Sequence, residues 1–478
     1  MKMFFKRIKT PGLAHLSYFI ATNGVAIVVD PKRDIDEYLK LAIENNAQIK
    51  YVFETHRQED FVIGSNELHE KTGAKIIGGR HPLFSHCDIQ LEDGEFFKIE
   101  DLTFLSLSTP GHTPESFSYG VYLKDRDTCW GVFTGDTLFV GDTGRTDLSD
   151  PDKTSENAKL IYNSVRSKIA NLGDQSLIFP AHGSGSVCGG AIADYDQTTI
   201  GYEKTYNPVF TMGEDEFTCH KVKERIPRPP YFSLMEKINY EGGWRIEQDL
   251  AKIKALSPEQ FLEMSNKGII IDTREPEAFA SGHIPGSYNI WLDGLQVFGG
   301  WFCKKDTPVF LVLDRHDDLN TARLMLSRLG VGRIKAFLSG GIESVRNSGY
   351  NLESFGVIYP KELFHNKRNF EIFDVREITE FESGHIENSK HCFVGHLEDY
   401  LIKHRPPNKS IATICSVGHR GGIAASIFAK MGHKNVYNVL GGMKAWNSRG
   451  LPIQEGKETK GKREIKNIEN VAQWGSTH

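Results

Sequence analysis

The sequence predicts an α/β protein of three domains, in which the second and third domains are copies of one another. A length of 478 residues is enough for about three domains at ~150 residues each. The apolar fraction of 39% and the charged fraction of 25% are typical of globular proteins that bury hydrophobic cores. Motifs in the second half of the chain repeat at a constant spacing, whereas residues 1–245 contain no such repeat.

Four short runs of apolar or β-branched residues predict strands in the first domain, at 25–29, 51–53, 102–107 and 131–133. Each of the last three runs leads into a segment that contains a candidate metal ligand. Loops at strand ends are held in place by a rigid sheet, and they are common positions for catalytic and binding residues. We therefore expect the functional site of this domain on these loops.

The candidate metal ligands are His56, His112 and Asp136. His56 opens the segment HRQEDF at 56–61, His112 closes a TPGH motif, and Asp136 lies within TGDT. Two imidazoles and one carboxylate form the set that holds non-haem Fe(II) and leaves coordination positions open for O2 and substrate. The sequence therefore predicts one Fe(II) ion per chain at these three residues.

Two tandem copies of one α/β unit make up the second half of the chain. The motif DTRE at 272–275 recurs as DVRE at 374–377, a spacing of 374 − 272 = 102 residues, and GHI at 282–284 recurs at 384–386 with the same spacing. Within each copy, apolar runs alternate with charged helical segments, which is typical of a parallel α/β sheet. Both copies are therefore expected to have the same fold.

The repeat also sets the predicted domain bounds. The first domain takes up 1–245, and the two copies take up 253–352 and 356–455. The remaining tail, 456–478, is rich in Lys, Glu and Asn. It is expected to be mobile, because it has too few apolar residues to join a core.

The third domain contains a candidate nucleophile, Cys415, in the segment CSVGHRG at 415–421. This cysteine follows an apolar strand and precedes a helix that is predicted to start near Gly422. Backbone N–H groups and the helix N-terminus then favour a thiolate or persulfide anion. Arg420 adds a fixed positive charge to this loop, and we expect Cys415 and Arg420 to be the catalytic residues.

The second domain lacks this nucleophile. At the repeat spacing, Cys415 corresponds to Leu313 and Arg420 corresponds to Asp318. Because an acidic residue stands where an anion would bind, this copy is predicted to be catalytically inactive. We expect it to serve as a spacer or as a surface for homo-oligomer formation.

Several motifs of the first domain resemble those of the metallo-β-lactamase superfamily, and within it those of the persulfide dioxygenase branch. The resemblance implies an αββα sandwich. It also implies that His56, His112 and Asp136 are sufficient as iron ligands, because the single-iron dioxygenases of this superfamily need only these three positions. The two copies that follow resemble α/β rhodanese domains, with Cys415 at the position of the persulfide-carrying cysteine. The motifs of the first domain that carry the resemblance are DP at 30–31, TH at 55–56, GS at 64–65, TPGHTP at 109–114, TGDTLF at 134–139, GRTD at 144–147 and PAHG at 180–183.

The segment 56–61 departs from the superfamily pattern HxHxDH, because Gln58 and Phe61 replace two imidazoles. Dinuclear zinc hydrolases use these imidazoles, so a two-metal hydrolytic site is not expected. The resemblance implies supporting roles around the iron. Gln58 orients a ligand or a metal-bound water, Asp60 lies next to the ligands, and His182 lines the pocket as a base or hydrogen-bond partner. The alternative is a degenerate site that binds no metal.

Two further residues are candidates for substrate binding. Arg145 matches the arginine that holds the carboxylate of the thiol carrier in this family, and a guanidinium suits a bidentate contact of this kind. A loop salt bridge of Arg145 with Asp142 or Asp147 is equally compatible with the sequence. Cys188 lies on the Gly/Ser-rich loop 183–190, where it either accepts sulfur near the iron or is an ordinary buried cysteine.

The order of the domains resembles persulfide dioxygenase–sulfurtransferase fusions that act in sulfide detoxification. The resemblance implies that O2 oxidises a low-molecular-weight thiol persulfide towards sulfite at the iron. Cys415 would carry a second sulfane sulfur, and its transfer to sulfite would give thiosulfate. One alternative is a zinc-dependent thioester hydrolase of the glyoxalase II type, and the other is a sulfur-carrier or scaffold protein in which only Cys415 is active.

Composition narrows the expected partners and compartment. The net charge of −5 and the lack of a long Lys/Arg block argue against nucleic acid binding. No apolar run approaches the ~20 residues of a membrane span. Seven cysteines without a CxxC pair fit the reduced thiols of the cytoplasm better than a disulfide framework. The sequence leaves open which thiol carries the persulfide.

Overall fold

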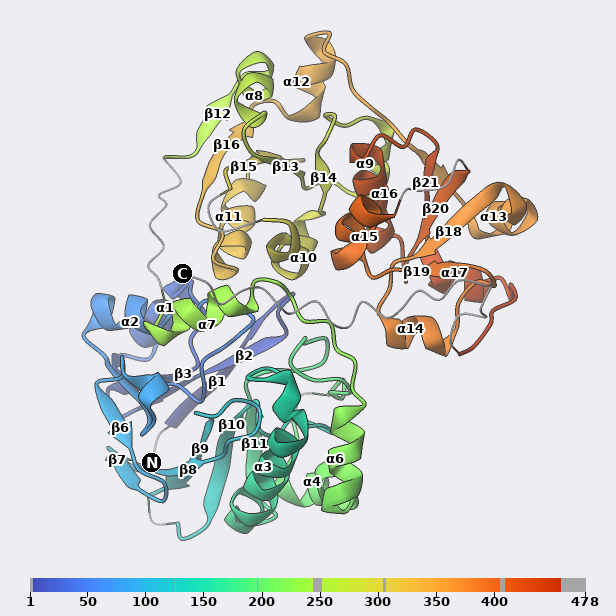
Figure 1. The fold of residues 1–478 in the computed structure, drawn as a ribbon. Coiled ribbons are helices and arrows are strands. Elements are labelled where there is room, and N and C mark those ends of the chain that lie inside the picture. Colours follow the sequence, from blue (N-terminus) through green and yellow to red (C-terminus); the bar gives the residue numbers. More distant parts are fainter. Residues whose placement is uncertain are drawn as a thin grey trace, which may run out of the picture. The chain divides into compact units, whose positions relative to one another are not determined.

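The computed structural model describes residues 3–124, 126–195, 197–243, 252–303, 307–404 and 409–456 (Figure 1). The chain divides into two compact units, Met1–Ser354 and Phe355–His478. Unit 1 contains the predicted first and second domains, and unit 2 contains the predicted third domain. The boundary segment 244–251 and the predicted tail, apart from Gly456, lie outside the described residues, so the bounds of the domains stay predictions.

Two β-sheets form the first part of unit 1. Their strands are β1 (Met3–Thr10), β2 (His15–Thr22), β3 (Val25–Val29), β4 (Gln48–Phe53), β5 (Lys75–Gly79), β6 (Ile89–Leu91), β7 (Phe96–Ile99), β8 (Leu102–Ser108), β9 (Phe117–Leu123), β10 (Cys129–Gly135) and β11 (Leu177–Pro180). The first sheet has the order β1-β2-β3-β4-β5-β6, and the second has the order β11-β10-β9-β8-β7. The predicted run 25–29 coincides with β3, and the other three predicted runs lie within longer strands.

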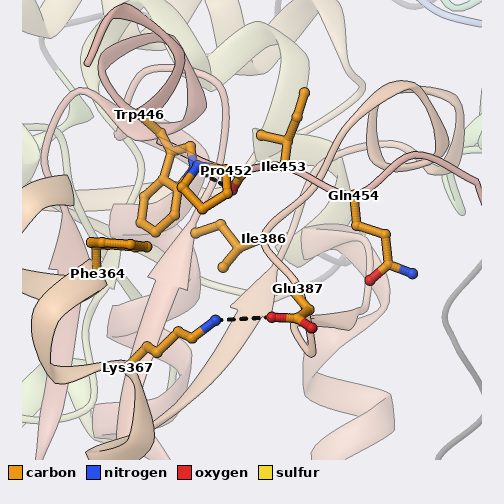
Figure 2. A pocket seen from close by; sticks show the side chains of 8 residues that line it. All are labelled: Phe364, Lys367, Ile386, Glu387, Trp446, Pro452, Ile453 and Gln454. Carbon is orange, nitrogen blue, oxygen red and sulfur yellow. Dashed lines mark hydrogen bonds and ion pairs between the residues drawn. The ribbon is translucent and has the colours of Figure 1, made fainter. Parts of the chain in front are cut away.

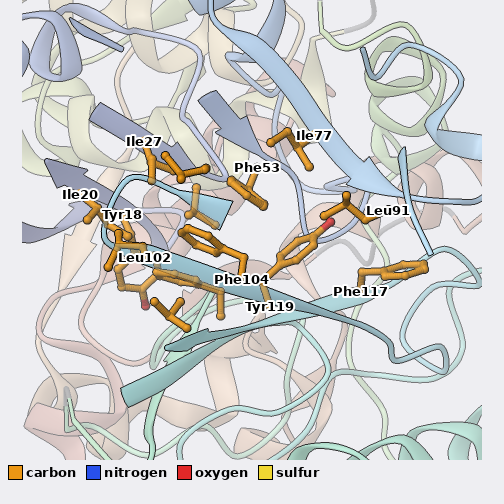
Figure 3. Packing of buried hydrophobic residues seen from close by; sticks show 14 of the residues in the cluster. Tyr18, Ile20, Ile27, Phe53, Ile77, Leu91, Leu102, Phe104, Phe117 and Tyr119 are labelled. Atoms are coloured by element: carbon orange, nitrogen blue, oxygen red, sulfur yellow. The ribbon is translucent and has the colours of Figure 1, made fainter. Parts of the chain in front are cut away.

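The two sheets face each other across one hydrophobic core (Figure 3). Phe53 of β4 stacks on Phe104 of β8 at a ring-centroid distance of 4.6 Å, and Tyr119 of β9 meets Phe53 edge-on at 5.0 Å. Burying an aromatic or branched apolar side chain of this size stabilises a fold by about 1.5–3 kcal/mol. The core therefore fixes the strand ends, and with them the loops that carry the candidate metal ligands.

Helices cover the outer faces of both sheets. The helices of this part of the chain are α1 (Asp36–Glu44), α2 (Ser65–Thr72), α3 (Thr154–Ser167), α4 (Ile200–Tyr206), α5 (Pro208–Thr211), α6 (Glu214–Val222) and α7 (Phe232–Tyr240), of which α7 contacts the loop 58–63. Leu41 of α1 and Leu68 of α2 pack on the first sheet, and Ile161 and Val165 of α3 pack on the second. This order of layers confirms the predicted αββα sandwich.

The two copies have the same fold, which confirms the prediction of two α/β domains after the sandwich. The first copy has the sheet order β12-β16-β15-β13-β14 and the second has β17-β21-β20-β18-β19, with every pair parallel. The elements of the first copy are β12 (Lys254–Leu256), α8 (Pro258–Ser265), β13 (Ile269–Asp272), α9 (Pro276–Ser281), β14 (Tyr288–Asn289), α10 (Leu295–Phe302), β15 (Val309–Val312), α11 (Asp318–Arg328), β16 (Ile334–Leu338) and α12 (Gly341–Asn347). Those of the second are β17 (Gly356–Ile358), α13 (Pro360–Asn366), β18 (Phe370–Asp374), α14 (Ile378–Ser383), β19 (Lys390–His391), α15 (Leu397–Lys403), β20 (Ser410–Ile414), α16 (His419–Lys430), β21 (Val436–Val439) and α17 (Gly442–Ser448).

A buried ion pair explains the repeated DxRE motif. The Arg274 guanidinium donates to the Asp272 carboxylate at 2.6 and 2.9 Å and to the carbonyl of Gly282 at 2.9 Å. Arg376 makes the same contacts with Asp374 and with the equivalent glycine. The pair ties the end of the β13 or β18 strand to the turn after the next helix, so the motif is a structural element of both copies.

Candidate functional site

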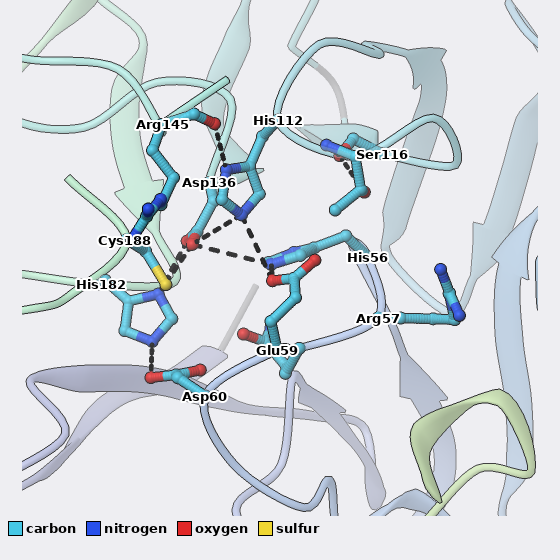
Figure 4. A network of polar contacts seen from close by, with 12 residues as sticks. His56, Arg57, Glu59, Asp60, His112, Ser116, Asp136, Arg145, His182 and Cys188 are labelled. Carbon is cyan, nitrogen blue, oxygen red and sulfur yellow. Dashed lines mark hydrogen bonds and ion pairs between the residues drawn. The ribbon is translucent and has the colours of Figure 1, made fainter. Parts of the chain in front are cut away.

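The three candidate metal ligands lie together at the ends of strands of the sandwich (Figure 4). His56 follows β4, His112 follows β8 and Asp136 follows β10, and all three side chains are buried. Asp136 Oδ2 lies 3.7 Å from His56 Nε2 and 3.4 Å from His112 Nε2. The fold thus brings together three residues that are far apart in the sequence.

Hydrogen bonds fix which nitrogen of each imidazole faces the centre. Nδ1 of His112 donates to the carbonyl of Arg145 at 2.9 Å, because a carbonyl oxygen can only accept. The Thr55 hydroxyl donates to Asp30 at 2.8 Å and lies 3.0 Å from Nδ1 of His56, so it accepts from that nitrogen. Nδ1 of each ring is therefore engaged outside the centre, and Nε2 is the nitrogen that faces it, as in metal-binding imidazoles. Burial opposes protonation of His112, but Glu59 and Asp136 raise its pKa above the ordinary value.

The electrostatics of this set suit a divalent cation. Burial lowers the pKa of His56 to about 3, so this imidazole is neutral. Burial alone would raise the pKa of Asp136, but His182 and His56 hold it below its ordinary value, so this side chain is a carboxylate. Within the described ranges, Nε2 of His56 and Nε2 of His112 have no hydrogen-bond partner. Buried polar atoms without partners cost free energy, and a bound metal removes that cost.

Glu59 also reaches this centre, and the sequence analysis gave it no role. Its Oε2 lies 3.4 Å from His112 Nε2 and 3.9 Å from His56 Nε2. Burial raises the pKa of Glu59 to about 7, and the neighbouring His112 opposes this rise. Glu59 could have been noticed in the sequence as a carboxylate within the segment 56–61, three positions after the candidate ligand His56.

His182 and Asp60 form a chain of hydrogen bonds behind Asp136. Nδ1 of His182 lies 2.8 Å from Asp136 Oδ1, and Nε2 of His182 lies 3.0 Å from Asp60 Oδ2. Burial opposes protonation of His182, but the carboxylates of Asp136 and Asp60 raise its pKa well above the ordinary value. The imidazolium form donates to both carboxylates and thereby orients Asp136.

The two residues that depart from the superfamily pattern are both buried. Gln58 is buried, and its side-chain amide has no hydrogen-bond partner among the residues the structure describes. The Phe61 ring packs against His15 at a centroid distance of 4.2 Å and against His182 at 6.4 Å. Phe61 thus fills apolar space where the pattern has an imidazole.

Asn239 of α7 holds this loop, and sequence reasoning did not identify it. Its Nδ2 donates to the carbonyls of Gln58 and Phe61 at 2.6 and 2.8 Å, and its Oδ1 accepts from the N–H of Ile63 at 3.0 Å. No pattern marks a lone asparagine so far from residues 56–61. The role becomes visible only when α7 packs against the loop.

The first copy also contacts the loop that follows His56 within unit 1. The carbonyl of Arg328, the last residue of α11, accepts from the N–H of Val62 at 2.7 Å. The Arg328 guanidinium forms a bidentate pair with Asp34 at 2.7 and 2.8 Å. These contacts give the copy a structural role at the first domain.

Arg145 and Cys188 are both buried beside the centre. The Arg145 guanidinium forms a bidentate pair with Asp147 at 2.6 and 2.7 Å and donates to the carbonyls of Val187, Ile226 and Pro227. The salt-bridge alternative is thus observed for Arg145, and carrier binding stays a prediction. Cys188 Sγ lies within 4.8 Å of ligand atoms of His112 and His182. Burial raises the pKa of Cys188 well above the ordinary value, so its side chain is a neutral thiol.

Cys415 lies between β20 and α16 in unit 2, with its side chain buried. The N–H of Gly418 donates to Cys415 Sγ at 3.1 Å, and this contact needs the positive φ of 116° that glycine adopts. The helix begins at His419, earlier than predicted, so Arg420 lies in its first turn. The loop therefore presents a backbone donor to the sulfur, as the sequence implied.

Arg420 is paired with Glu380 of α14, which the sequence analysis did not identify. The guanidinium reaches the two carboxylate oxygens at 2.6 and 2.8 Å, and Ser416 Oγ bonds to the same carboxylate at 2.6 Å. Burial would raise the pKa of Glu380, but Arg420 lowers it to about 2. The charge of Arg420 is therefore largely neutralised next to the sulfur.

The corresponding loop of the first copy has a different character. Leu313 follows β15 as a buried apolar residue, and α11 begins at Asp318. The seven cysteines are all free thiols. Cys303, at the end of α10, is buried, and burial raises its pKa to about 12.

A pocket of about 250 Å³ opens in unit 2 (Figure 2). The side chains of Phe364 and Trp446 form its apolar wall, and a Lys367–Glu387 ion pair of 3.0 Å lies at its edge. Its lining includes neither Cys415 nor Arg420. Among the described helices, none combines the length and the apolar character of a transmembrane span.

Comparisons with known proteins agree with this division of the chain. Residues 10–182 match the metallo-beta-lactamase superfamily, and residues 257–348 and 360–449 match the rhodanese-like domain. A crystal structure of a metallo-beta-lactamase from Staphylococcus aureus is 28% identical, with a TM-score of 0.63, and covers 71% of this chain and 99% of its own.

Two curated relatives differ in their activities. The mitochondrial persulfide dioxygenase ETHE1 of Homo sapiens is 26% identical over 224 residues, which are 46% of this chain and 79% of the human protein. The hydroxyacylglutathione hydrolase of Dictyostelium discoideum is 32% identical over 164 residues, which are 34% of this chain and 58% of that protein. Because one relative is a dioxygenase and the other a hydrolase, similarity alone assigns neither activity.

Proposed function

We propose that this chain, which joins a metallo-β-lactamase superfamily domain to two rhodanese-like domains, oxidises a low-molecular-weight thiol persulfide with O2. The observation that carries the proposal is the buried set of His56, His112 and Asp136, whose ligand atoms face one position. The similarity to the human persulfide dioxygenase supports the same assignment.

Fe(II) bound at this set would supply open coordination positions for O2 and substrate and the redox chemistry that activates O2. One persulfide, one O2 and one water would give one thiol, one sulfite and two protons. The terminal sulfur loses the electrons that reduce O2, and the inner sulfur leaves as the thiol.

The chain's own residues would orient the ligands, hold a proton and exclude water. Asp136 is held in place by the imidazolium of His182, which in turn donates to Asp60. This imidazolium keeps a proton beside the centre, where an anionic product needs charge compensation. Phe61 and the neutral thiol of Cys188 line the same buried space. Their low polarity strengthens the electrostatic interactions inside it.

Cys415 would carry the sulfur in a second reaction. Its thiolate takes a sulfane sulfur from a persulfide, whose thiol leaves with the electron pair of the broken S–S bond. The outer sulfur of the Cys415 persulfide then bonds to sulfite, the cysteine recovers its thiolate, and thiosulfate is released. The Gly418 N–H faces the sulfur throughout and stabilises its negative charge.

A zinc-dependent thioester hydrolase is the second candidate, because a hydroxyacylglutathione hydrolase is among the relatives. Two features of the site favour the oxygenase instead. The side chains of Gln58 and Phe61 replace two imidazoles, and Phe61 offers no atom that can bind a metal. Hydrolysis of a glutathione thioester by the Zn(II)-loaded chain, without O2 uptake by the Fe(II)-loaded chain, would reverse the assignment.

The test is O2 consumption by the full chain after anaerobic loading with Fe(II) and addition of glutathione persulfide. We expect rapid uptake, and we expect His112→Ala to abolish it because a ligand is lost. His69→Ala is the matched control, since His69 lies half-exposed on α2 and contacts the carbonyl of Ala74. No uptake by a chain with iron bound would refute the proposal.

We further propose that the chain acts in the cytoplasm and forms a homo-oligomer through its inactive copy. Light scattering coupled to size-exclusion chromatography measures the oligomeric state directly. A monomer at micromolar concentration would contradict self-association. Cell fractionation with an antibody against the chain tests the compartment.

A further inference from the structure

A second group of side chains with metal-binding atoms lies in the sandwich and shares no residue with the centre described above. Glu54 follows β4, and His86 and Cys87 lie between β5 and β6, and their ligand atoms are all within 4.8 Å of one another. We infer that these three residues form a second metal site, which binds Zn(II). The inference does not rest on the proposed function.

The distances between the ligand atoms are close to those around a tetrahedral cation. His86 Nε2 lies 2.9 Å from Glu54 Oε2 and 3.8 Å from Cys87 Sγ. Around Zn(II), with bond lengths of about 2.0–2.3 Å, neighbouring ligand atoms lie about 3.3–3.6 Å apart. Small side-chain movements therefore admit the ion. Zn(II) accepts oxygen, nitrogen and sulfur ligands, and three protein ligands leave its fourth position to water.

One oxygen of the Glu54 carboxylate has no partner. The residue is 1% exposed, and its Oε1 makes no hydrogen bond with any residue the structure describes. A buried carboxylate oxygen without a partner costs free energy, and a bound cation removes that cost. The ion pair of Glu54 with His86 uses only Oε2, so it does not account for the whole carboxylate.

The fold holds these ligands in place. The N–H of Glu54 donates to the carbonyl of Ile77 at 2.9 Å, and the Tyr119 hydroxyl donates to the carbonyl of Glu54 at 3.0 Å. Gly78 leaves room for the sulfur, because a Cβ at this position would lie 2.7 Å from Cys87 Sγ. Cys87 is half-buried, so an ion can enter from its side of the group.

The charge balance of the group suits a divalent cation. Burial opposes protonation of His86, but Glu54 raises its pKa above the ordinary value, and burial raises the pKa of Cys87. The group without metal is therefore a carboxylate, an imidazolium and a thiol, with no net charge. When Zn(II) binds, the thiol and the imidazolium each release a proton to solvent, and the carboxylate and the thiolate neutralise the ion. The net charge of the group stays zero.

The nearest charges outside the group are paired. Arg57, whose charge acts on the imidazole, forms an ion pair with Glu115 at 2.9 Å. Asp88, whose charge acts on the thiol, forms an ion pair with Lys75 at 3.3 Å. These pairs compensate the outside charges, so the three ligands themselves decide the charge that the ion meets.

The experiment is a titration of the full, metal-free chain with Co(II), which replaces Zn(II) and gives a charge-transfer band in the near ultraviolet when a thiolate is a ligand. We expect the wild type to show this band and Cys87→Ser to lose it, because a hydroxyl does not replace a soft thiolate ligand. Competition with a chromophoric chelator measures Zn(II) affinity. We expect Glu54→Gln to weaken the binding of one equivalent of Zn(II) by at least ~10-fold.

Two variants serve as controls. Cys188→Ser removes another buried cysteine of unit 1, which lies next to the first centre, and it should keep the band. His112→Ala removes a candidate ligand of the first centre and should also keep the band, because the two groups share no residue. Far-UV circular dichroism verifies that each variant is folded.

The outcomes separate this inference from the proposed function. The second site is refuted if the wild type gives no thiolate band, or if Cys87→Ser keeps the band. A band that is lost in Cys188→Ser and kept in Cys87→Ser would place the thiolate at the first centre and overturn the inference. Failure of O2 uptake by the iron-loaded chain would refute only the proposed function.

Discussion

The metal centre of unit 1 and the cysteine loop of unit 2 are both buried, but they satisfy their polar groups in opposite ways. At the metal centre, Nε2 of His56, Nε2 of His112 and Oε2 of Glu59 have no hydrogen-bond partner within the described part of the chain, although carboxylates lie 3.4–3.9 Å from both nitrogens. At the cysteine loop, Arg420 and Glu380 pair with each other, and a backbone N–H already faces the sulfur.

The difference shows what each site still requires. Buried polar atoms without partners are costly, so the metal centre is complete only with a cation. The cysteine loop needs no ion, because its charges are paired inside the protein. Its chemistry requires only a sulfur donor and an acceptor. The two centres should therefore respond separately to mutation, metal and pH.

The largest expected effect is the loss of sulfur transfer in Cys415→Ser. A hydroxyl cannot carry a persulfide, so formation of thiosulfate from persulfide and sulfite should stop, while O2 uptake by the Fe(II)-loaded chain should not change. Cys392→Ser is the control, since Cys392 is another buried cysteine of unit 2. Loss of O2 uptake in Cys415→Ser would show that the two centres are not independent.

The next effect is the stabilisation of unit 1 by metal. A ligand at 100 times its Kd that binds only the folded state stabilises it by about 2.7 kcal/mol. Oxidation of a buried methionine reports unfolding when it is measured at increasing denaturant concentration. With redox-inert Zn(II) bound, the denaturant concentration at which Met235, buried in α7, is half oxidised should rise. The midpoint for Met443, buried in α17, should stay the same. Equal shifts of the denaturant midpoint at Met235 and Met443 would contradict the conclusion that only the centre of unit 1 requires a metal.

A smaller effect is expected from Asn239→Ala. The change leaves the carbonyls of Gln58 and Phe61 and the N–H of Ile63 without their partner, which costs about 1–3 kcal/mol for each buried group that stays unsatisfied. Metal affinity should fall ~10-fold, because the loop that follows the candidate ligand His56 is released.

The control for this variant is Asn163→Ala on the exposed side of α3, whose amide bonds to the carbonyl of Lys159. It should change neither the unfolding of unit 1 nor the metal affinity. An Asn239→Ala chain that keeps wild-type affinity would mean that the sheet alone positions the loop.

The smallest expected effect is the pH dependence of unit 2. Arg420 lowers the pKa of Glu380 from 4.5 to about 2 in the folded state, against the effect of burial. The stability from this pair is therefore fully present above pH 4.5 and is lost as the pH falls towards 2. Glu380→Gln should weaken the pH dependence of the denaturant midpoint measured at Met443. It should leave the midpoint measured at Met235 unchanged. An unchanged slope would contradict the pairing.

The two copies show how much a repeat in the sequence can predict. Both keep the Asp–Arg pair and the same strand order, so the repeated DxRE and GHI motifs correctly predicted a shared fold. The contrast between Leu313 and Cys415 predicted which copy lacks a nucleophile. The repeat gave no indication that Arg328 of the first copy contacts the loop that follows His56, because that contact joins segments with no common pattern.

The internal repeat in the sequence predicted the two α/β copies, and the motifs after apolar runs predicted the main candidate residues. The αββα sandwich was implied by the resemblance of these motifs to the metallo-β-lactamase superfamily. Strand-length apolar runs and motifs at loop positions carry that information locally. Only the tertiary structure decided that Glu59 reaches the two imidazoles, that Asn239 holds their loop and that Glu380 neutralises Arg420. These roles depend on side-chain direction and on packing between distant elements, and neither leaves a periodic pattern in the chain.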